Sequence, residues 1–136
     1  MTQHFVENID PALSHYTFMG RDTSFKVFPQ LGGSVQDWTY NEHPILVPFG
    51  HSERSLQFYR EFCVNGVLFP FPNRLEHGLF SHEGEKYQLP INEPERNNAI
   101  HGFLNTRKFE VVQVKNDQIS LCYHHRTNAE FQFDFS

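Results

Sequence analysis

Residues 69–103 read FPFPNRLEHGLFSHEGEKYQLPINEPERNNAIHGF, and they contain most of the functional signals in the chain. The stretch opens with Pro70 and Pro72, each of which fixes φ and removes a backbone donor. Because such a segment cannot lie in a central strand, we expect a rigid turn that presents Asn73 and Arg74 in one orientation. A hairpin, an Asn-rich loop and a His-Gly pair follow.

The hairpin is predicted around Gly84, which supplies a positive φ between the strand-like runs 78–82 and 86–89. A second hairpin is predicted around Asn116 by the same reasoning. The other strand-like runs are residues 16–20, 25–28, 34–40, 45–47, 108–114, 118–124 and 131–135. Of these, the run 45–47 is expected to be buried, and the run 131–135 alternates strictly between Phe and polar residues.

A helix is predicted only within residues 48–62, where Ser52 can cap the N-terminus and Glu53 lies in the first turn. The remaining pattern of roughly nine or ten short strands predicts an all-β fold, an antiparallel β-sandwich or barrel. The 15 Phe and 5 Tyr residues favour the same conclusion, because aromatic side chains prefer half-buried pleated surfaces. With 136 residues, the chain is expected to form one domain, residues 1–136.

The composition argues against several classes of partner. A net charge of −5 and the absence of any run of Lys or Arg predict no binding to nucleic acid or to an anionic membrane surface. Cys63 and Cys122 lie far apart and outside any CxxC motif, so we expect two half-buried thiols rather than a disulfide framework. The first residues do not form a signal peptide, and no stretch approaches the ~20 apolar residues of a membrane helix. We therefore expect a cytoplasmic protein.

Arg74 and His101 are the side chains best suited to chemistry. Arg74 offers a planar fork of donors for hydroxyl, carboxylate or phosphate oxygens, although it could instead pair with a neighbouring carboxylate such as Glu76. His101 can bind or move a proton near neutral pH, but a lone His is often only a hydrogen-bonded structural residue. The amides of Asn97 and Asn98 suit hydroxyl-rich ligands. With aromatic rings nearby to stack on sugars, these residues suggest carbohydrate binding.

Metal and nucleotide motifs are missing from the sequence. No HxH, HExxH or clustered Cys/His spacing occurs, and His124 and His125 would face opposite sides of a strand. There is no P-loop, GxGxxG or GxSxG either. We therefore expect neither a metal nor a cofactor.

The stretch 69–103 resembles the signature region of the aldose 1-epimerase (galactose mutarotase) family. In that family an Asn-Arg pair follows a Pro-rich strand end, and an Asn-rich loop leads to His-Gly. The matching positions, in order, are Asn73-Arg74-Leu75, Gly78, Gly84, Tyr87-Gln88-Leu89, Asn92, Asn97-Asn98 and His101-Gly102. The resemblance extends more weakly to residues 27–33 and 131–135.

The resemblance implies a galactose mutarotase-like supersandwich, of which this chain would be the N-terminal half. It implies an enzyme that interconverts the anomers of a free sugar without a cofactor. A general base takes the proton of the C1 hydroxyl, and a general acid protonates the ring oxygen. By resemblance, Asn73, Arg74, Asn98 and His101 bind the sugar, a hexose or hexose phosphate, and His101 also takes part in the chemistry.

The sequence also departs from the family pattern. Phe103 stands where sugar mutarotases have a second Gly, and neither the general acid His nor the general base Glu of the family can be assigned. The run 131–135 continues to Ser136 without a turn, which suggests that the natural reading frame is longer. Two alternatives stay open: a non-catalytic carbohydrate-binding module, and a product that self-associates through open sheet edges. The sequence does not indicate which sugar is bound, or whether Arg74, Arg96 or Arg107 reads a phosphate.

Overall fold

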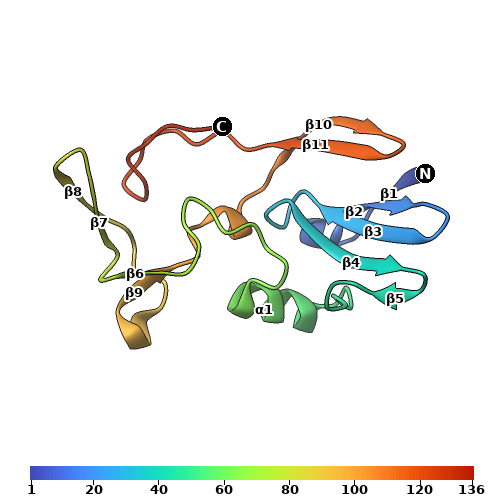
Figure 1. Cartoon of the computed structure of the whole chain (residues 1–136), viewed down its shortest axis with the longest axis horizontal. Coiled ribbons are helices and arrows are strands. Elements are labelled where there is room, and N and C mark those ends of the chain that lie inside the picture. The colour runs from blue at the N-terminus through green and yellow to red at the C-terminus, as the bar shows by residue number, and fades with distance from the viewer. The chain divides into compact units, whose positions relative to one another are not determined.

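Strands dominate the structure, a computed structural model that describes residues 1–136 (Figure 1). The chain divides into unit 1, which comprises Met1–Val67 and Asn105–Tyr123, and unit 2, which comprises Leu68–Leu104 and His124–Ser136. Every named strand pair is antiparallel, and one α-helix is present. The predicted all-β antiparallel architecture is therefore confirmed. No helix is long and apolar enough to cross a membrane.

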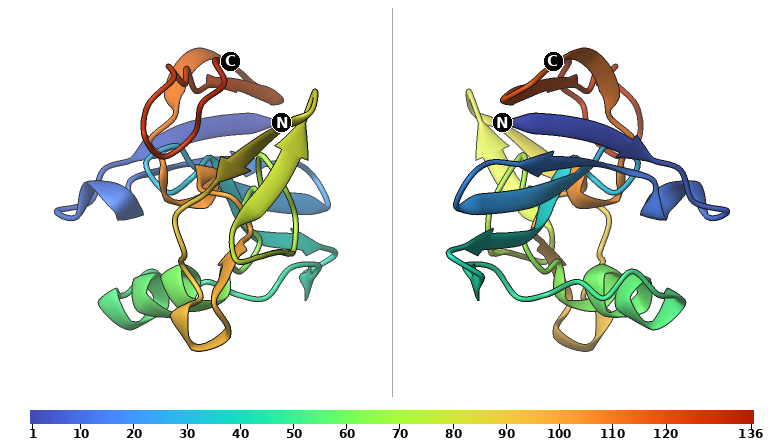
Figure 2. Two further views of the ribbon diagram at one scale, coloured as in Figure 1. Left: turned by 90° about the vertical axis from the view of Figure 1, so that its left-hand side faces the viewer. Right: turned by 90° about the vertical axis from the view of Figure 1, so that its right-hand side faces the viewer.

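A five-stranded antiparallel sheet forms most of unit 1, and each strand pairs with the next one in the chain. Its strands are β1 (Thr2–Val6), β2 (His15–Met19), β3 (Thr23–Phe28), β4 (Ser34–Tyr40) and β5 (His43–Pro44). Figure 1 and Figure 2 show the blue-to-teal strands side by side, with β1 at one edge of the sheet. The predicted run 34–40 coincides with β4, whereas β1 has no counterpart among the predicted strands.

β4 buries its polar side chains and exposes its apolar ones. Ser34 and Gln36 are fully buried, while Trp38 and Tyr40 are exposed. Gln36 is satisfied in this position because its amide donates to the carbonyl oxygen of Val64 at 3.0 Å. Buried polar groups are tolerated when they are hydrogen-bonded in this way.

Helix α1 (Glu53–Phe62) covers the core of unit 1, and Ser52 caps it as predicted. The Ser52 hydroxyl accepts the N–H of Ser55 at 3.2 Å. Leu56 and Tyr59 face inward and join Leu13, Phe28, Leu31 and Phe49 in one buried cluster. The helix therefore closes the buried cluster of unit 1 through these two side chains.

The predicted hairpins are confirmed in both units. Strands β10 (Glu110–Lys115) and β11 (Gln118–Cys122) pair in unit 1. Strands β7 (Leu79–His82) and β8 (Glu85–Gln88) pair in unit 2, and Gly84 has a φ of 86° in their turn. A fourth sheet, β6 (Arg74–Glu76) with β9 (Asn98–Ile100), was not predicted.

The short 3₁₀ turns are Pro11–Leu13, Pro94–Arg96 and Leu104–Thr106. Cys63 and Cys122 are half-buried and form no disulfide.

Two of the strand-like runs do not form strands. The run 45–47 is not buried: Ile45 and Val47 are each more than half exposed. The run 131–135 makes only one backbone bridge, between His125 and Phe135, because the side chain of Asn128 accepts the N–H groups of residues 130 and 131 and turns the chain. The alternation survives in the side chains, since the three Phe of this run are half-buried and the residues between them exposed.

Asp37 occupies a strained position in β4, with a φ of 49° next to the bulge in the β3–β4 register. Its carboxylate accepts the N–H of Phe49 at 2.7 Å and the ammonium of Lys26 at 2.9 Å, and it contacts Nε2 of His51. Burial raises the pKa of Asp37, but these three donors lower it more, to about 2. The folded protein therefore holds Asp37 ionised more strongly than the unfolded chain does.

We expect this cluster to make stability depend on pH in acid. Because the pKa of Asp37 falls from 3.8 to about 2 on folding, its contribution is complete above pH 3.8 and is lost as the pH falls through 2. Urea unfolding of wild type and Asp37→Asn should differ by about 2 kcal/mol at pH 7 and converge near pH 2. Asp117→Asn, in the exposed β10–β11 turn, removes the same charge as a control. A difference that stays constant down to pH 2 would contradict the assignment.

Candidate functional site

The β6–β9 ladder of unit 2 brings the predicted site residues together. Its register pairs Arg74 with Ile100 and Glu76 with Asn98. Just beyond the ladder, the N–H of His101 donates to the carbonyl oxygen of Asn73 at 2.9 Å. The Asn-Arg and His-Gly motifs, separated by 28 positions from Asn73 to His101, are therefore adjacent in space.

The ring of His101 is oriented by the backbone of Asn73. Its Nδ1 accepts the N–H of Asn73 at 3.2 Å. When the imidazole is neutral, an accepting Nδ1 leaves the proton on Nε2, which is then a donor. His101 is half-buried, and its ring hydrogen bond uses Nδ1 and leaves Nε2 unengaged.

Gly102 allows the chain to pass very close to the Pro-rich turn. Its φ is 63°, and a Cβ atom at this position would lie 2.0 Å from the carbonyl oxygen of Phe69. The same oxygen accepts the N–H of Phe103 at 2.9 Å. Only glycine fits here, and its presence fixes where His101 stands relative to Phe69.

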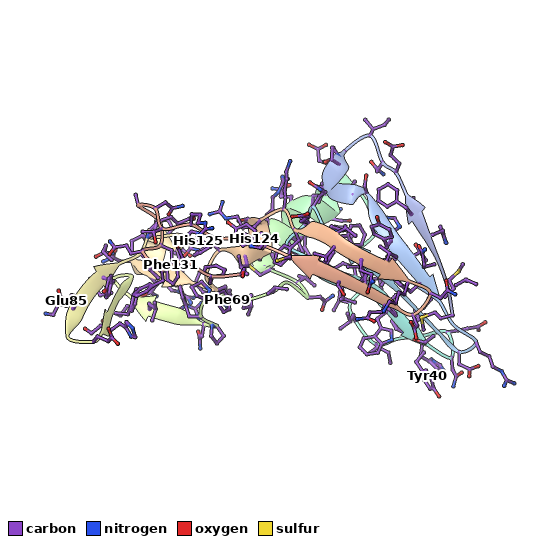
Figure 3. All side chains as sticks on the ribbon, turned by 90° about the horizontal axis from the view of Figure 1, so that it is seen from above. Tyr40, Phe69, Glu85, His124, His125 and Phe131 are labelled. Carbon is purple, nitrogen blue, oxygen red and sulfur yellow. The ribbon has the colours of Figure 1, made fainter.

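The side chain of Phe103 packs in the core of unit 2. It is 8% exposed and packs on the rings of His125 and Phe131 at centroid distances of 5.3 and 5.6 Å. Figure 3 labels Phe69, His125 and Phe131, which all belong to this aromatic region of unit 2. Phe103, which stands where sugar mutarotases have a second Gly, therefore places an aromatic ring in the core next to the His-Gly pair.

Arg74 pairs with Glu93 and not with Glu76. Its Nε lies 2.8 and 3.0 Å from the two Glu93 carboxylate oxygens, and its Nη2 lies 2.8 Å from Oε1. The Glu76 side chain is 88% exposed, and its contact is with His77. The suggestion of Glu76 as the partner is thus wrong, although the idea of a carboxylate partner for Arg74 is correct.

Glu93 is a site residue that the sequence did not single out. It is buried, and its side chain also accepts Nδ2 of Asn98 at 2.9 Å and lies 3.5 Å from Arg96. The hydrogen bonds from Arg74 and then Asn98 lower the pKa of Glu93 to about 2. No motif distinguishes Glu93 from the other Glu residues of this stretch, because its importance comes from burial and from a partner 19 positions away.

The Asn residues of the loop are used mainly inside the protein. Oδ1 of Asn92 accepts the N–H of Ile100 at 2.6 Å, and Nδ2 of Asn92 donates to the carbonyl oxygen of Ile100 at 2.8 Å. Asn97 donates to Nδ1 of His77 at 2.6 Å. Asn98 gives its amide N–H to Glu93, while its Oδ1 accepts no hydrogen bond. The loop is thus a braced support for the site, and Asn98 retains its Oδ1 acceptor and the second N–H of Nδ2.

Unit 2 has a small cavity beside Gly102. It measures about 60 Å³ and is lined by Phe71, Leu89, Pro90, Asn92, Ala99, Gly102, Phe103 and Glu130. Sites that enclose small-molecule ligands measure ~300 Å³ or more. This cavity is therefore too small to enclose a ligand of that size. No three His, Cys, Asp or Glu side chains converge as a metal site would require.

The comparisons with known proteins agree with the resemblance seen in the sequence. The model of the family described as aldose 1-epimerase matches residues 17–136. The protein YihR of Escherichia coli K12 is 30% identical over 91 residues, which cover 67% of this chain and 28% of YihR.

Two solved structures share the fold. A galactose mutarotase-like protein from Clostridium acetobutylicum superposes with a TM-score of 0.75 at 28% identity, over 92% of this chain and 39% of that one. Galactose 1-epimerase from Lactobacillus acidophilus gives a TM-score of 0.74 at 18% identity, over 96% of this chain and 41% of that one. The expected galactose mutarotase-like fold is confirmed. The chain spans less than half the length of each of these proteins.

Proposed function

Because the chain belongs to the aldose 1-epimerase family, we propose that its residues 73–101 form one wall of a sugar site that serves the interconversion of sugar anomers. The observation that carries this proposal is the β6–β9 ladder, which holds Arg74 and His101 on neighbouring positions. A galactose 1-epimerase and a galactose mutarotase-like protein share the fold, which supports a hexose as the ligand.

Each residue has a role in this proposal. Arg74 donates to the hydroxyls of the sugar, and Nε2 of His101 donates to an oxygen near the reacting carbon. Asn73 orients both, through its backbone and its side-chain oxygen, which lies 3.4 Å from Nη1 of Arg74. Asn98 supplies an acceptor. Ring opening needs only proton transfers, so the reaction uses no cofactor.

Binding without catalysis is favoured for this chain by itself. Anomer exchange requires a general acid and a general base, and each contributes typically 10²–10⁴-fold. Glu93, the carboxylate that contacts Arg74, has a pKa of about 2 and is ionised at neutral pH, so it cannot act as the general acid. The second candidate function is therefore a carbohydrate-binding module of the same fold.

Two further expectations belong to this proposal. We expect the protein to act in the cytoplasm. We also expect self-association through open sheet edges, which the exposed Phe5 on the edge strand β1 supports. Unpaired strand edges are ready templates for pairing with another chain.

We expect His101→Ala to lower the affinity for D-galactose or D-glucose about tenfold, because a charged or polar ligand contact of this kind is lost. Chemical-shift titration of the ¹⁵N-labelled chain measures the affinity. His4→Ala, on the exposed surface of β1, is the matched control.

Polarimetry of freshly dissolved sugar then separates the two functions. An accelerated approach to the anomeric equilibrium supports the enzyme, and binding without acceleration supports the module. If the wild-type chain bound neither sugar, or if His101→Ala and His4→Ala bound equally well, the proposal would be wrong.

A further inference from the structure

Glu93 connects Arg74 of β6 with Asn98 of β9, and it also lies 3.5 Å from Arg96. We propose that Glu93 is the positioning residue of the site, which holds the guanidinium of Arg74 so that its Nη1–Nη2 end faces the ligand. The inference rests on the proposed function, in which Arg74 contacts the sugar.

Counting the donors of Arg74 shows which edge is left for a ligand. Of its five N–H groups, the one on Nε and one on Nη2 point to the Glu93 carboxylate at 2.8–3.0 Å. One on Nη1 lies 3.4 Å from Oδ1 of Asn73. The remaining two N–H groups sit on neighbouring nitrogens of the guanidinium end. Such a pair matches two oxygens on adjacent atoms of a ligand.

The Glu93 side chain is itself well fixed. Its backbone N–H donates to the carbonyl oxygen of Asn98 at 3.1 Å, and its own carbonyl accepts the N–H of Asn98 at 3.2 Å. The amide of Asn98 closes a third contact, to Oε2 at 2.9 Å. A carboxylate held from its backbone and its tip can define the plane of the guanidinium it binds, whereas a mobile one cannot.

Burial makes this pairing more than a surface ion pair. The Glu93 side chain is 9% exposed, while that of Arg74 is 40% exposed. The carboxylate thus lies on the protein side and the guanidinium reaches from it toward solvent. A long, flexible Arg side chain would otherwise lose rotamer freedom each time a sugar bound. Glu93 removes that cost in advance.

The test is Glu93→Gln, which keeps the shape of the side chain and removes its charge. We expect the affinity for D-galactose to fall roughly tenfold. The Arg74 Nε–H signal in ¹⁵N spectra should also lose its hydrogen-bonded shift and its protection from exchange, which reports directly whether Glu93 holds the guanidinium. Glu95→Gln is the matched control, because Glu95 is exposed and makes no hydrogen bond to Arg74.

A double-mutant cycle with Arg74→Ala decides whether Glu93 acts through Arg74. In the Arg74→Ala background, Glu93→Gln should change sugar affinity no further. Equal losses in both backgrounds would overturn the inference, and so would an unchanged Arg74 Nε–H signal in Glu93→Gln. If the signal changed as expected but the wild-type chain bound no sugar, the positioning of Arg74 would stand and the proposed function would fall.

Discussion

Gly102→Ala is expected to destabilise unit 2 by about 3 kcal/mol or more, a loss at the upper end of the range for single substitutions. An added Cβ atom would lie 2.0 Å from the carbonyl oxygen of Phe69 and 2.3 Å from its carbonyl carbon. Both obstacles are backbone atoms, so no side-chain rotation relieves the clash. The φ of 63° adds a further cost for any residue with a Cβ.

Gly84→Ala provides the control for this prediction. Gly84 also has a positive φ, 86°, but an added Cβ would meet nothing within 4 Å. Gly84→Ala should therefore lower the free energy of unfolding by only about 1 kcal/mol, the cost of a positive φ for a residue with a Cβ. Urea unfolding followed by the amide signals of β6 and β9 measures both variants. Equal stabilities would show that the close approach of Gly102 to Phe69 does not constrain the site.

Tyr59→Ala is expected to destabilise unit 1 by about 3–5 kcal/mol, because it leaves a large cavity in a closely packed core. Tyr59 is fully buried among the side chains of that core. Its hydroxyl lies 3.1 Å from the carbonyl oxygen of Asn105 and 3.3 Å from that of Leu31, and burial raises its pKa to about 12. Tyr59→Phe keeps the ring and should cost only about 1–2 kcal/mol.

Phe58→Ala is the matched control for the core prediction. Phe58 is the preceding residue of α1, it is 49% exposed, and its ring contacts Phe62 on the outer side of the helix. Its removal should cost less than about 1 kcal/mol. Thermal and urea unfolding of the three variants test the order. Similar losses for Tyr59→Ala and Phe58→Ala would mean that α1 does not pack as described.

Elements with local signals were predictable from the sequence. The start of α1 follows from the hydroxyl of Ser52 and its bond to Ser55, which needs only a few neighbouring residues. The β7–β8 turn follows from Gly84, because a positive φ is favourable for glycine. β4 follows from its period of two.

The buried face of β4 was not predictable from the same pattern. A period of two identifies two faces and does not say which one is inward. Here the inward face contains Gln36, and its partners Val64 and Asn65 lie 28 and 29 positions away. In the run 131–135 the period of two correctly separates half-buried from exposed side chains, but it cannot supply a partner strand.

The sequence identified the motif residues of the candidate site but not the contacts that connect them. Arg74 and Asn98 lie in the β6–β9 ladder, and Asn73 and His101 pair just beyond its end. The ladder itself has three residues in each strand, too few for a periodic signal. The preference of Arg74 for Glu93 over the nearer Glu76 depends on burial, which strengthens an ion pair and is not visible in the order of residues.

The β6–β9 ladder also separates the site from the hairpin that it encloses. The chain leaves β6 after Glu76, forms β7 and β8, and returns to β9 at Asn98, where Asn97 and His77 close the base through their side chains and backbone. The tip of this hairpin is the turn next to Glu85, which Figure 3 labels. Insertions or deletions at that tip would leave Arg74 and His101 in register. The hairpin can therefore vary in length without disturbing the backbone contacts that hold Arg74 and His101 next to each other.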